Sequence, residues 1–398
     1  MRVSLIVSVA LGSVCALGCG DDLPSSLASS GLGSTSGSTG SSGAIDSSSS
    51  GSAPDDTRAT GDGTGSSSSG ATGEGADGES SESSSGDDSG AEPACESPLQ
   101  LVPCDAPTDS PEPLQAMELG CVGPADATVP LSFATFASAD PDAWRVARRL
   151  GTHDDEETGE PTWGPTQGEQ LLILSTGTLP PTDELGAVTM DVLVEDANDN
   201  PDDKPLPAPM TAAFGGGFEP FVDCDGTGDC SNTLWNEWLG GGSAAYDLVW
   251  FQFRTEVPSG TYGFAFDAAL FSEEFPESVG TVFNDMLVVW SSSESYVGNL
   301  CVPEGEACSV GAQWPVPFHE NSAELAGTGF SAHEFDEGGG TGWFRVEGSS
   351  VPHEQLELTV ALFDMGDDQR DTLVLLDGFG WDCEGCSASP DDRCRGSR

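Results

Sequence analysis

The chain has 398 residues, and 67 acidic side chains against only 12 Lys and Arg give it a formal net charge of −55 at pH 7. This balance excludes nucleic acid as a partner, because neutralising phosphates requires clustered basic side chains. An acidic surface of this size instead favours solubility and attracts divalent cations as counterions.

Residues 1–18 are typical of an export signal. A positive charge at Arg2 precedes a mostly apolar run over residues 3–17, which is shorter than the roughly 20 residues that a membrane-spanning helix needs. The sequence Ala-Leu-Gly-Cys that ends at Cys19 resembles the lipobox of bacterial lipoproteins, although Ala stands where Leu is usual. We therefore predict that acyl chains on Cys19 hold the protein in the cell envelope, at the surface of the outer membrane. The alternative is an ordinary signal peptide, cleaved without lipid attachment.

Residues 19–94 contain mainly Ser, Gly, Thr, Ala and acidic residues, with few large apolar side chains. Such a segment cannot bury enough apolar surface to offset the entropy lost on ordering, so we expect a disordered tether. A Gly/Ser coil of this length has a root-mean-square reach of about 45–50 Å. The predicted tether holds the rest of the chain away from the membrane.

Cysteines recur throughout the remaining chain. Without Cys15 and Cys19, 12 − 2 = 10 cysteines remain, and an even number in an exported chain predicts disulfide bonds, five in this case. Short loops separate Cys224 from Cys230 and Cys301 from Cys308, so we expect these two local pairs. The pairing of the other six stays open: Cys95, Cys104, Cys121, Cys383, Cys386 and Cys394. The last segment, Cys383-Glu384-Gly385-Cys386, also has the spacing of a redox or zinc motif, which is the minor alternative.

Residues 140–149 have the sequence features of a short surface helix. Asp140-Pro141 supplies a cap and a first turn. Arg145, Arg148 and Arg149 then fall near the expected C-terminus, where the helix dipole favours basic side chains.

Farther along, short apolar runs alternate with a period of two, which is typical of strands. Leu356, Leu358, Val360 and Leu362 fall on one face of such a run. No long helical pattern separates the runs, so we predict an all-β fold, an antiparallel two-sheet sandwich of the jelly-roll kind that follows the tether. The predicted strands are 170–176, 187–195, 249–254, 262–271, 286–291, 342–347, 356–362 and 372–376.

Three blocks of sequence resemble the choice-of-anchor L domain. The main block is FAFDAALFSEEFPESV at residues 264–279, followed by Phe283-Asn284-Asp285; the others are LSTG at 174–177 and VALFDMGD at 360–367 with Asp371. Met-Leu-Val replaces the aromatic-rich stretch that usually follows Asn-Asp. The resemblance covers residues 165–382. It leaves a cysteine-containing N-terminal extension at 95–164 and a cysteine-containing tail at 383–398, and it implies a bacterial surface domain with no established activity.

Two acidic segments follow predicted strands and are candidate calcium ligands. If the strands before them run in the same direction in facing sheets, both segments emerge at one end of the sandwich, where their carboxylates repel one another unless a cation lies among them. Calcium prefers carboxylate, amide and carbonyl oxygens. The predicted ligands are Glu273, Glu274, Asn284, Asp285, Asp364 and Asp367. A solvated acidic loop and a glycosidase carboxylate pair are the alternatives.

Other motifs indicate little chemistry. The chain lacks the GxSxG, HExxH and P-loop motifs, so we expect no enzyme activity. Asp196-Ala197-Asn198-Asp199-Asn200 begins like an EF-hand loop, but Pro201 then occupies the glycine position, which leaves at most a single calcium turn. Trp235 and Trp238 fit either a sugar-stacking pair or core packing. We expect a surface module that binds a glycan or a protein; the alternatives are a structural envelope protein and, less favoured, a carbohydrate-active enzyme.

Overall fold

The computed structural model describes residues 101–105, 112–124, 126–191, 198–213, 229–312, 314, 319–320, 322–331, 338–366 and 368–385. Every described residue belongs to the unit Ser85–Arg398. The predictions for Cys19, the tether, Cys224 and Asp367 fall outside the described residues. Among the helices described, none has the length and hydropathy needed to cross a membrane.

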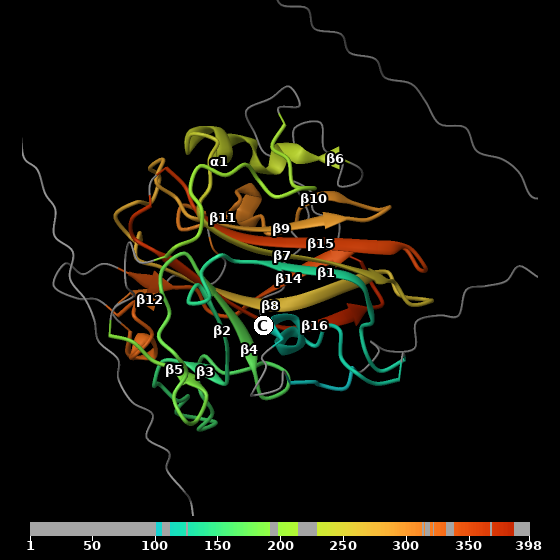
Figure 1. Ribbon diagram of the computed structural model, residues 1–398, viewed down its shortest axis with the longest axis horizontal. Coiled ribbons are helices and arrows are strands. Elements are labelled where there is room, and N and C mark those ends of the chain that lie inside the picture. Colours follow the sequence, from blue (N-terminus) through green and yellow to red (C-terminus); the bar gives the residue numbers. More distant parts are fainter. Residues whose placement is uncertain are drawn as a thin grey trace, which may run out of the picture. The chain divides into compact units, whose positions relative to one another are not determined.

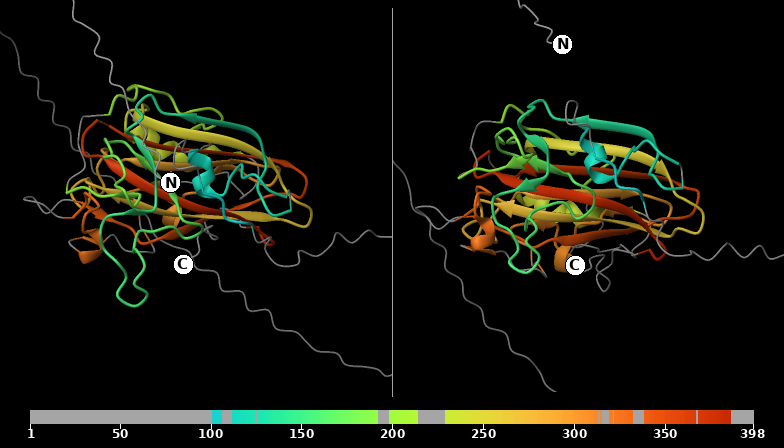
Figure 2. Two further views of the ribbon diagram at one scale, coloured as in Figure 1. Left: turned by 60° about the horizontal axis from the view of Figure 1, so that its bottom comes forward. Right: turned by 90° about the horizontal axis from the view of Figure 1, so that it is seen from below.

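The described part is an all-β sandwich, as predicted (Figures 1 and 2). The first sheet runs, in spatial order, through β1 (Leu131–Ala137), β7 (Tyr246–Glu256), β15 (Gln355–Asp364), β9 (Met286–Ser292), β10 (Val297–Asn299) and β6 (Asp229–Cys230), with β11 (Cys308–Ser309) also beside β9. The second sheet runs through β12 (His319–Glu320), β13 (Gly339–Gly340), β8 (Gly263–Ser272), β16 (Thr372–Asp382), β4 (Leu171–Ser175) and β2 (Trp144–Ala147), with β14 (Phe344–Ser349) also beside β8.

Pairing within both sheets is antiparallel except between β10 and β6. A short parallel pair joins β3 (Arg149–Leu150) to β5 (Ala187–Val188). Helical segments are brief: the 3-10 helices η1 (Pro113–Met117), η2 (Ser231–Leu234), η3 (Pro303–Gly305) and η4 (Ala323–Leu325), and the α-helix α1 (Trp235–Gly240).

A central core fills the space between the two sheets. Phe251 and Phe253 of β7 and Val360 of β15 meet Phe266 of β8 and Val374 of β16 in one buried cluster. These side chains are at most 2 % exposed, and full burial of each contributes about 1.5–3 kcal/mol. This packing holds the facing strands, and the loops at their ends, in fixed positions.

The outer faces of both sheets are also covered. On the second sheet, Phe271 and Leu375 pack under Trp163 and Leu325. On the first sheet, Phe363 packs under the helix α1, with Trp238 edge-on at 5.8 Å between ring centroids. Every residue of β8 is therefore buried. Trp238 belongs to this covering layer, as its core interpretation predicted.

The helix predicted at residues 140–149 is wrong, because this segment forms β2 and β3. Asp140 accepts a hydrogen bond from the Asp142 amide at 2.7 Å, which makes a turn instead of a helix cap. Arg145 donates to the carbonyl oxygens of Pro141 at 2.8 Å and Pro180 at 2.9 Å, so its side chain ties the strand to neighbouring loops. Pairing of β2 with β4 outweighs the local helix signal.

The other strand predictions hold, with changes in length. The run at 187–195 forms only β5, over two residues, and residues 192–197 are outside the described part. β16 continues to Asp382 past an irregularity between Asp377 and Gly380. Sequence reasoning missed β1, which covers the edge of the first sheet beside β7.

One predicted disulfide pair is confirmed. Cys301 and Cys308 are bonded, with Cα atoms 5.3 Å apart. Cys104 and Cys121, whose pairing was open, are bonded as well, with Cα atoms 5.8 Å apart. Cys230 is disulfide-bonded, while its predicted partner Cys224 is outside the described residues.

Candidate cation site

Five strand ends meet at one end of the sandwich. Ser272, at the end of β8, lies opposite Thr372, at the start of β16, and the next residue of β16, Leu373, lies opposite Ser175 at the end of β4. In the first sheet, Phe363 near the end of β15 lies opposite Met286 at the start of β9. The two acidic segments that follow β8 and β15 are thereby brought together.

Four carboxylates gather at this end, and we call Glu274, Asp285, Asp364 and Asp371 the carboxylate cluster. All four are buried, with at most 1 % of each residue exposed. A side-chain oxygen of Glu274, Oε2, accepts the backbone amide of Asp285 at 2.9 Å. The hydroxyl of Thr372 donates to Oδ2 of Asp285 at 2.6 Å.

Asp364 is the least satisfied member of the cluster. The residue is fully buried, yet within the described part of the chain neither side-chain oxygen accepts a hydrogen bond of normal geometry. A buried carboxylate without hydrogen-bond donors costs several kcal/mol unless it is neutralised. A proton or a cation is the means by which such a group is compensated.

The pKa values of acids in the cluster also indicate that a proton or a cation must compensate their charge. Burial raises the pKa of Asp285 well above its ordinary value; the charge of Glu274 raises it further, and the Thr372 hydroxyl offsets part of the shift. Burial likewise raises the pKa of Asp364, followed by the charges of Asp285 and Asp371, with the nearby Thr176 hydroxyl opposing them. The cluster therefore resists carrying its full negative charge at neutral pH in the absence of a cation.

The remaining predicted ligands lie in different settings. Asn284 is buried and its Oδ1 accepts the Gly311 amide at 3.1 Å, so this side chain fixes the loop before β9. Glu273 is partly buried, and its backbone amide donates to the carbonyl oxygen of Asp371 at 3.1 Å. Asp367 is outside the described residues. Of the six predicted ligands, the structure brings Glu274, Asp285 and Asp364 into one cluster.

Sequence reasoning left four residues at this end of the sandwich out of the predicted site. Thr176 follows β4, and its hydroxyl lies 3.4 Å from Oδ1 of Asp371 and accepts the Thr372 amide at 2.8 Å. A side chain at Gly177 would put its Cβ 2.3 Å from Oδ2 of Asp371, so only glycine permits this approach. In the sequence, the signals for these residues were the adjacent pairs Thr176-Gly177 and Asp371-Thr372. Only the fold shows that the two pairs are in contact.

The cluster is not a formed coordination shell. Among the described residues, no three Asp, Glu, His or Cys side chains are arranged as ligands around a common point. A cation would require the side chains to turn toward one another, and oxygens of the backbone or of Asp367 to complete the six to eight that calcium takes.

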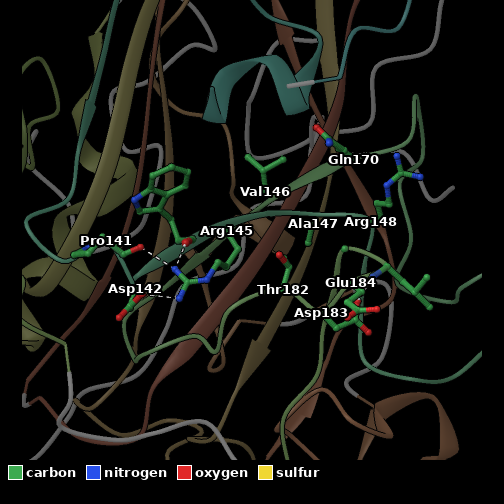
Figure 3. A pocket seen from close by; sticks show the side chains of 13 residues that line it. Pro141, Asp142, Arg145, Val146, Ala147, Arg148, Gln170, Thr182, Asp183 and Glu184 are labelled. Atoms are coloured by element: carbon green, nitrogen blue, oxygen red, sulfur yellow. Dashed lines mark hydrogen bonds and ion pairs between the residues drawn. The ribbon is translucent and has the colours of Figure 1, made fainter. Parts of the chain in front are cut away.

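Two other features carry less chemistry. A pocket of about 750 Å³ lies beside β2, and Figure 3 shows the Arg145 guanidinium turned back toward Pro141 and Asp142, with the Arg145–Asp142 ion pair at 2.6 Å. In the segment predicted as a calcium turn, Oδ1 of Asn200 accepts the amides of Ala139 at 2.6 Å and Asp140 at 3.0 Å. This oxygen is used to fix the loop before β2.

Comparison with known proteins identifies no relative. No protein-family model matches the chain, and no significantly similar sequence or structure was found among the curated proteins or the solved structures.

Proposed function

We propose that the protein is a lipid-anchored cell-surface module whose β-sandwich is stabilised by calcium and displayed for binding to a surface glycan or protein. The observation that supports this proposal most is the buried Asp364, which lies beside other acids and has no hydrogen-bond donor of normal geometry among the described residues. A cation among these groups would turn mutual repulsion into attraction.

The chemistry of the cluster favours calcium over softer metals. Its side chains offer carboxylate and hydroxyl oxygens, whereas zinc and copper prefer nitrogen and sulfur ligands. Calcium also tolerates the irregular geometry that loops at several strand ends would provide. The ligands we assign are the four acids of the carboxylate cluster, Glu274, Asp285, Asp364 and Asp371. The other three ligands predicted from the sequence, Glu273, Asn284 and Asp367, are neighbours of these acids in the chain.

A glycosidase is supported less well. Its two carboxylates must reach a sugar and a water molecule from an accessible cleft. Glu274, Asp285 and Asp364 are at most 1 % exposed, which suits an enclosed ion better than a polysaccharide substrate. The site therefore supports a structural role in a module that carries its binding surface elsewhere.

The proposal for the anchor and the display role rests on the sequence. Cys19 would carry the acyl chains, and residues 19–94 would place the sandwich some tens of ångströms from the membrane. The resemblance to choice-of-anchor L domains supports surface display, since those proteins differ in the anchor that they use.

The test is thermal unfolding of the full chain in millimolar calcium and in chelator. An ion that binds only the folded state stabilises by about 2.7 kcal/mol at a hundredfold excess over its Kd, which raises the Tm by roughly 5–10 °C for a domain of this size. Asp364→Asn should melt higher than the wild type in chelator, because a buried charge is gone, and should no longer respond to calcium.

The matched control is Asp368→Asn, which changes the net charge equally at an exposed position of the same loop. This variant should keep the full response to calcium. If the wild type melts at the same temperature with calcium and with chelator, and elemental analysis finds no metal, the cation is wrong. The display role is tested separately, by adhesion of cells to glycan arrays and by pull-down of envelope components.

A further inference from the structure

A second buried group of acids lies where the N-terminal extension meets the second sheet, well separated along β8 and β16 from the carboxylate cluster. Glu118, directly after η1, is 2 % exposed. Asp377 of β16 is fully buried and lies opposite Asp267 of β8, which is also buried. We call Glu118, Asp267 and Asp377 the Glu118 junction.

Hydrogen bonds at the junction join three separate segments. Oε2 of Glu118 accepts the Gly378 amide at 3.1 Å, which connects the extension to β16. Oδ2 of Asp377 accepts the amides of Thr166 and, at 3.0 Å, of Gln167, which connects β16 to the loop before β4. The other oxygen of Asp377, Oδ1, is buried without a hydrogen-bond partner in the described part of the chain.

The charged groups around Glu118 are unfavourable to its ionised form. Those with the largest effect on it are acids: Asp377, then Asp105 from the start of the described extension, then Asp267. The basic residue nearest in the sheet register is Arg345 of β14, opposite Asp267. Its guanidinium pairs with Glu347 at 3.2 Å and with Asp382 at 4.0 Å.

We propose that the Glu118 junction is a protonation-dependent clamp, which holds residues 112–120 against the second sheet while Glu118 carries a proton and loosens them when that proton passes to solvent. Glu118 and Asp377 already accept amides from neighbouring segments, so their neutral forms keep these contacts. The ionised form adds a buried negative charge beside the other two acids, and the described residues place no hydrogen-bonded counterion on Glu118.

Ionisation of the junction falls in an accessible pH range. Burial, followed by the charge of Asp377, raises the pKa of Glu118 from 4.5 to about 9. Burial raises the pKa of Asp377 from 3.8 to about 7, against the opposing effect of the Gln167 and Thr166 amides. Because both pKa values are raised by folding, the stability they contribute is complete below pH 4 and is lost as the pH rises, between pH 7 and 9 mainly through Glu118.

The experiment is hydrogen exchange of the full chain in chelator, read by mass spectrometry and corrected for the intrinsic exchange rate at each pH. Peptides that contain Thr166, Gln167 and Gly378 report the clamp, and peptides from the centres of β9 and β15 report opening of the whole sandwich. Between pH 7 and 9 the protection of the clamp peptides should fall about tenfold per pH unit, as expected for loss of one proton. The β9 and β15 peptides should change less.

Glu118→Gln replaces the acid by a neutral group of the same shape that can still accept the Gly378 amide. Its clamp peptides should stay protected up to pH 9, whereas Glu112→Gln, at the exposed N-cap of the same 3-10 helix, should keep the wild-type fall. An equal fall in Glu118→Gln and the wild type, or no fall in either, would overturn the proposal. It would also be overturned if calcium raised the protection of the wild-type clamp peptides at pH 9 without raising that of the β9 and β15 peptides, because the junction would then hold a cation rather than a proton.

Discussion

Acidic residues on one loop of this protein have opposite environments. Asp364 is fully buried at the end of β15, whereas Asp368 on the same loop is exposed. From the sequence, both belong to one acidic run, from which Asp364 and Asp367 were predicted as ligands. Asp364 is distinguished by its register opposite Tyr246 of β7, a partner more than 100 positions away in the chain. Residue-level prediction therefore included the partly buried Glu273 and left out the buried Asp371.

Gly177 gives a test at this scale. A Cβ at this position would lie 2.3 Å from Oδ2 of Asp371, so Gly177→Ala must displace that carboxylate. We expect a loss of about 1–3 kcal/mol in the free energy of unfolding, as for other overpacked buried positions, together with a weaker response to calcium. Urea unfolding measures both effects.

Gly380→Ala is the control for that substitution, because nothing lies within 4 Å of a Cβ built at Gly380. Its unfolding midpoint should stay close to the wild-type value. A Gly177→Ala protein as stable and as calcium-sensitive as the wild type would show that the contact between Gly177 and Asp371 is unimportant to the cluster.

At the scale of elements, alternation of apolar residues located most of the long strands. The period-two pattern found β7, β8, β9, β14, β15 and the first half of β16, because these strands carry large apolar side chains toward the central core. The pattern did not predict that the outer faces are covered too, since the covering residues come from loops and short helices. Residues 140–149 were misread because Asp-Pro and arginines also suit a helix, and only pairing with β4 decides between the two structures.

The bridge between Cys301 and Cys308 tests one of these elements. It closes the hairpin that places β11 against β9, and the Cys308 amide donates to the Cys301 carbonyl at 3.0 Å. A cross-link over so short a loop stabilises by about 2–3 kcal/mol through the unfolded state. The double variant Cys301→Ala/Cys308→Ala should therefore unfold at lower urea concentration than the wild type under non-reducing conditions.

The same comparison under reducing conditions is the control. The wild type and the double variant should then approach each other in stability, because neither has the bridge. If the two proteins unfold at the same urea concentration under non-reducing conditions, the bridge does not stabilise the hairpin.

At the scale of the whole molecule, the predicted organisation is a lipid anchor, a tether and a β-sandwich. Replacing Cys19 by Ser removes the acceptor of the acyl chains, so the protein should appear in the soluble fraction and not with membranes. Cell fractionation and immunoblotting measure this directly, with Cys15→Ser as the matched control because Cys15 lies inside the predicted signal. Unchanged membrane fractionation of Cys19→Ser would contradict lipid anchoring.

The proposed cation connects these scales, because one ion at the strand ends would join both sheets of the displayed domain. Its most direct test is equilibrium dialysis of the full chain against radioactive calcium in KCl at an ionic strength of about 0.15 M. Charges are then screened over about 8 Å, which suppresses loose binding of calcium to the acidic surface. We predict saturable binding that Asp364→Asn abolishes and that Asp368→Asn, with the same net charge, retains. Equal calcium binding by the two variants, or no saturable binding by the wild type at millimolar calcium, would contradict the account.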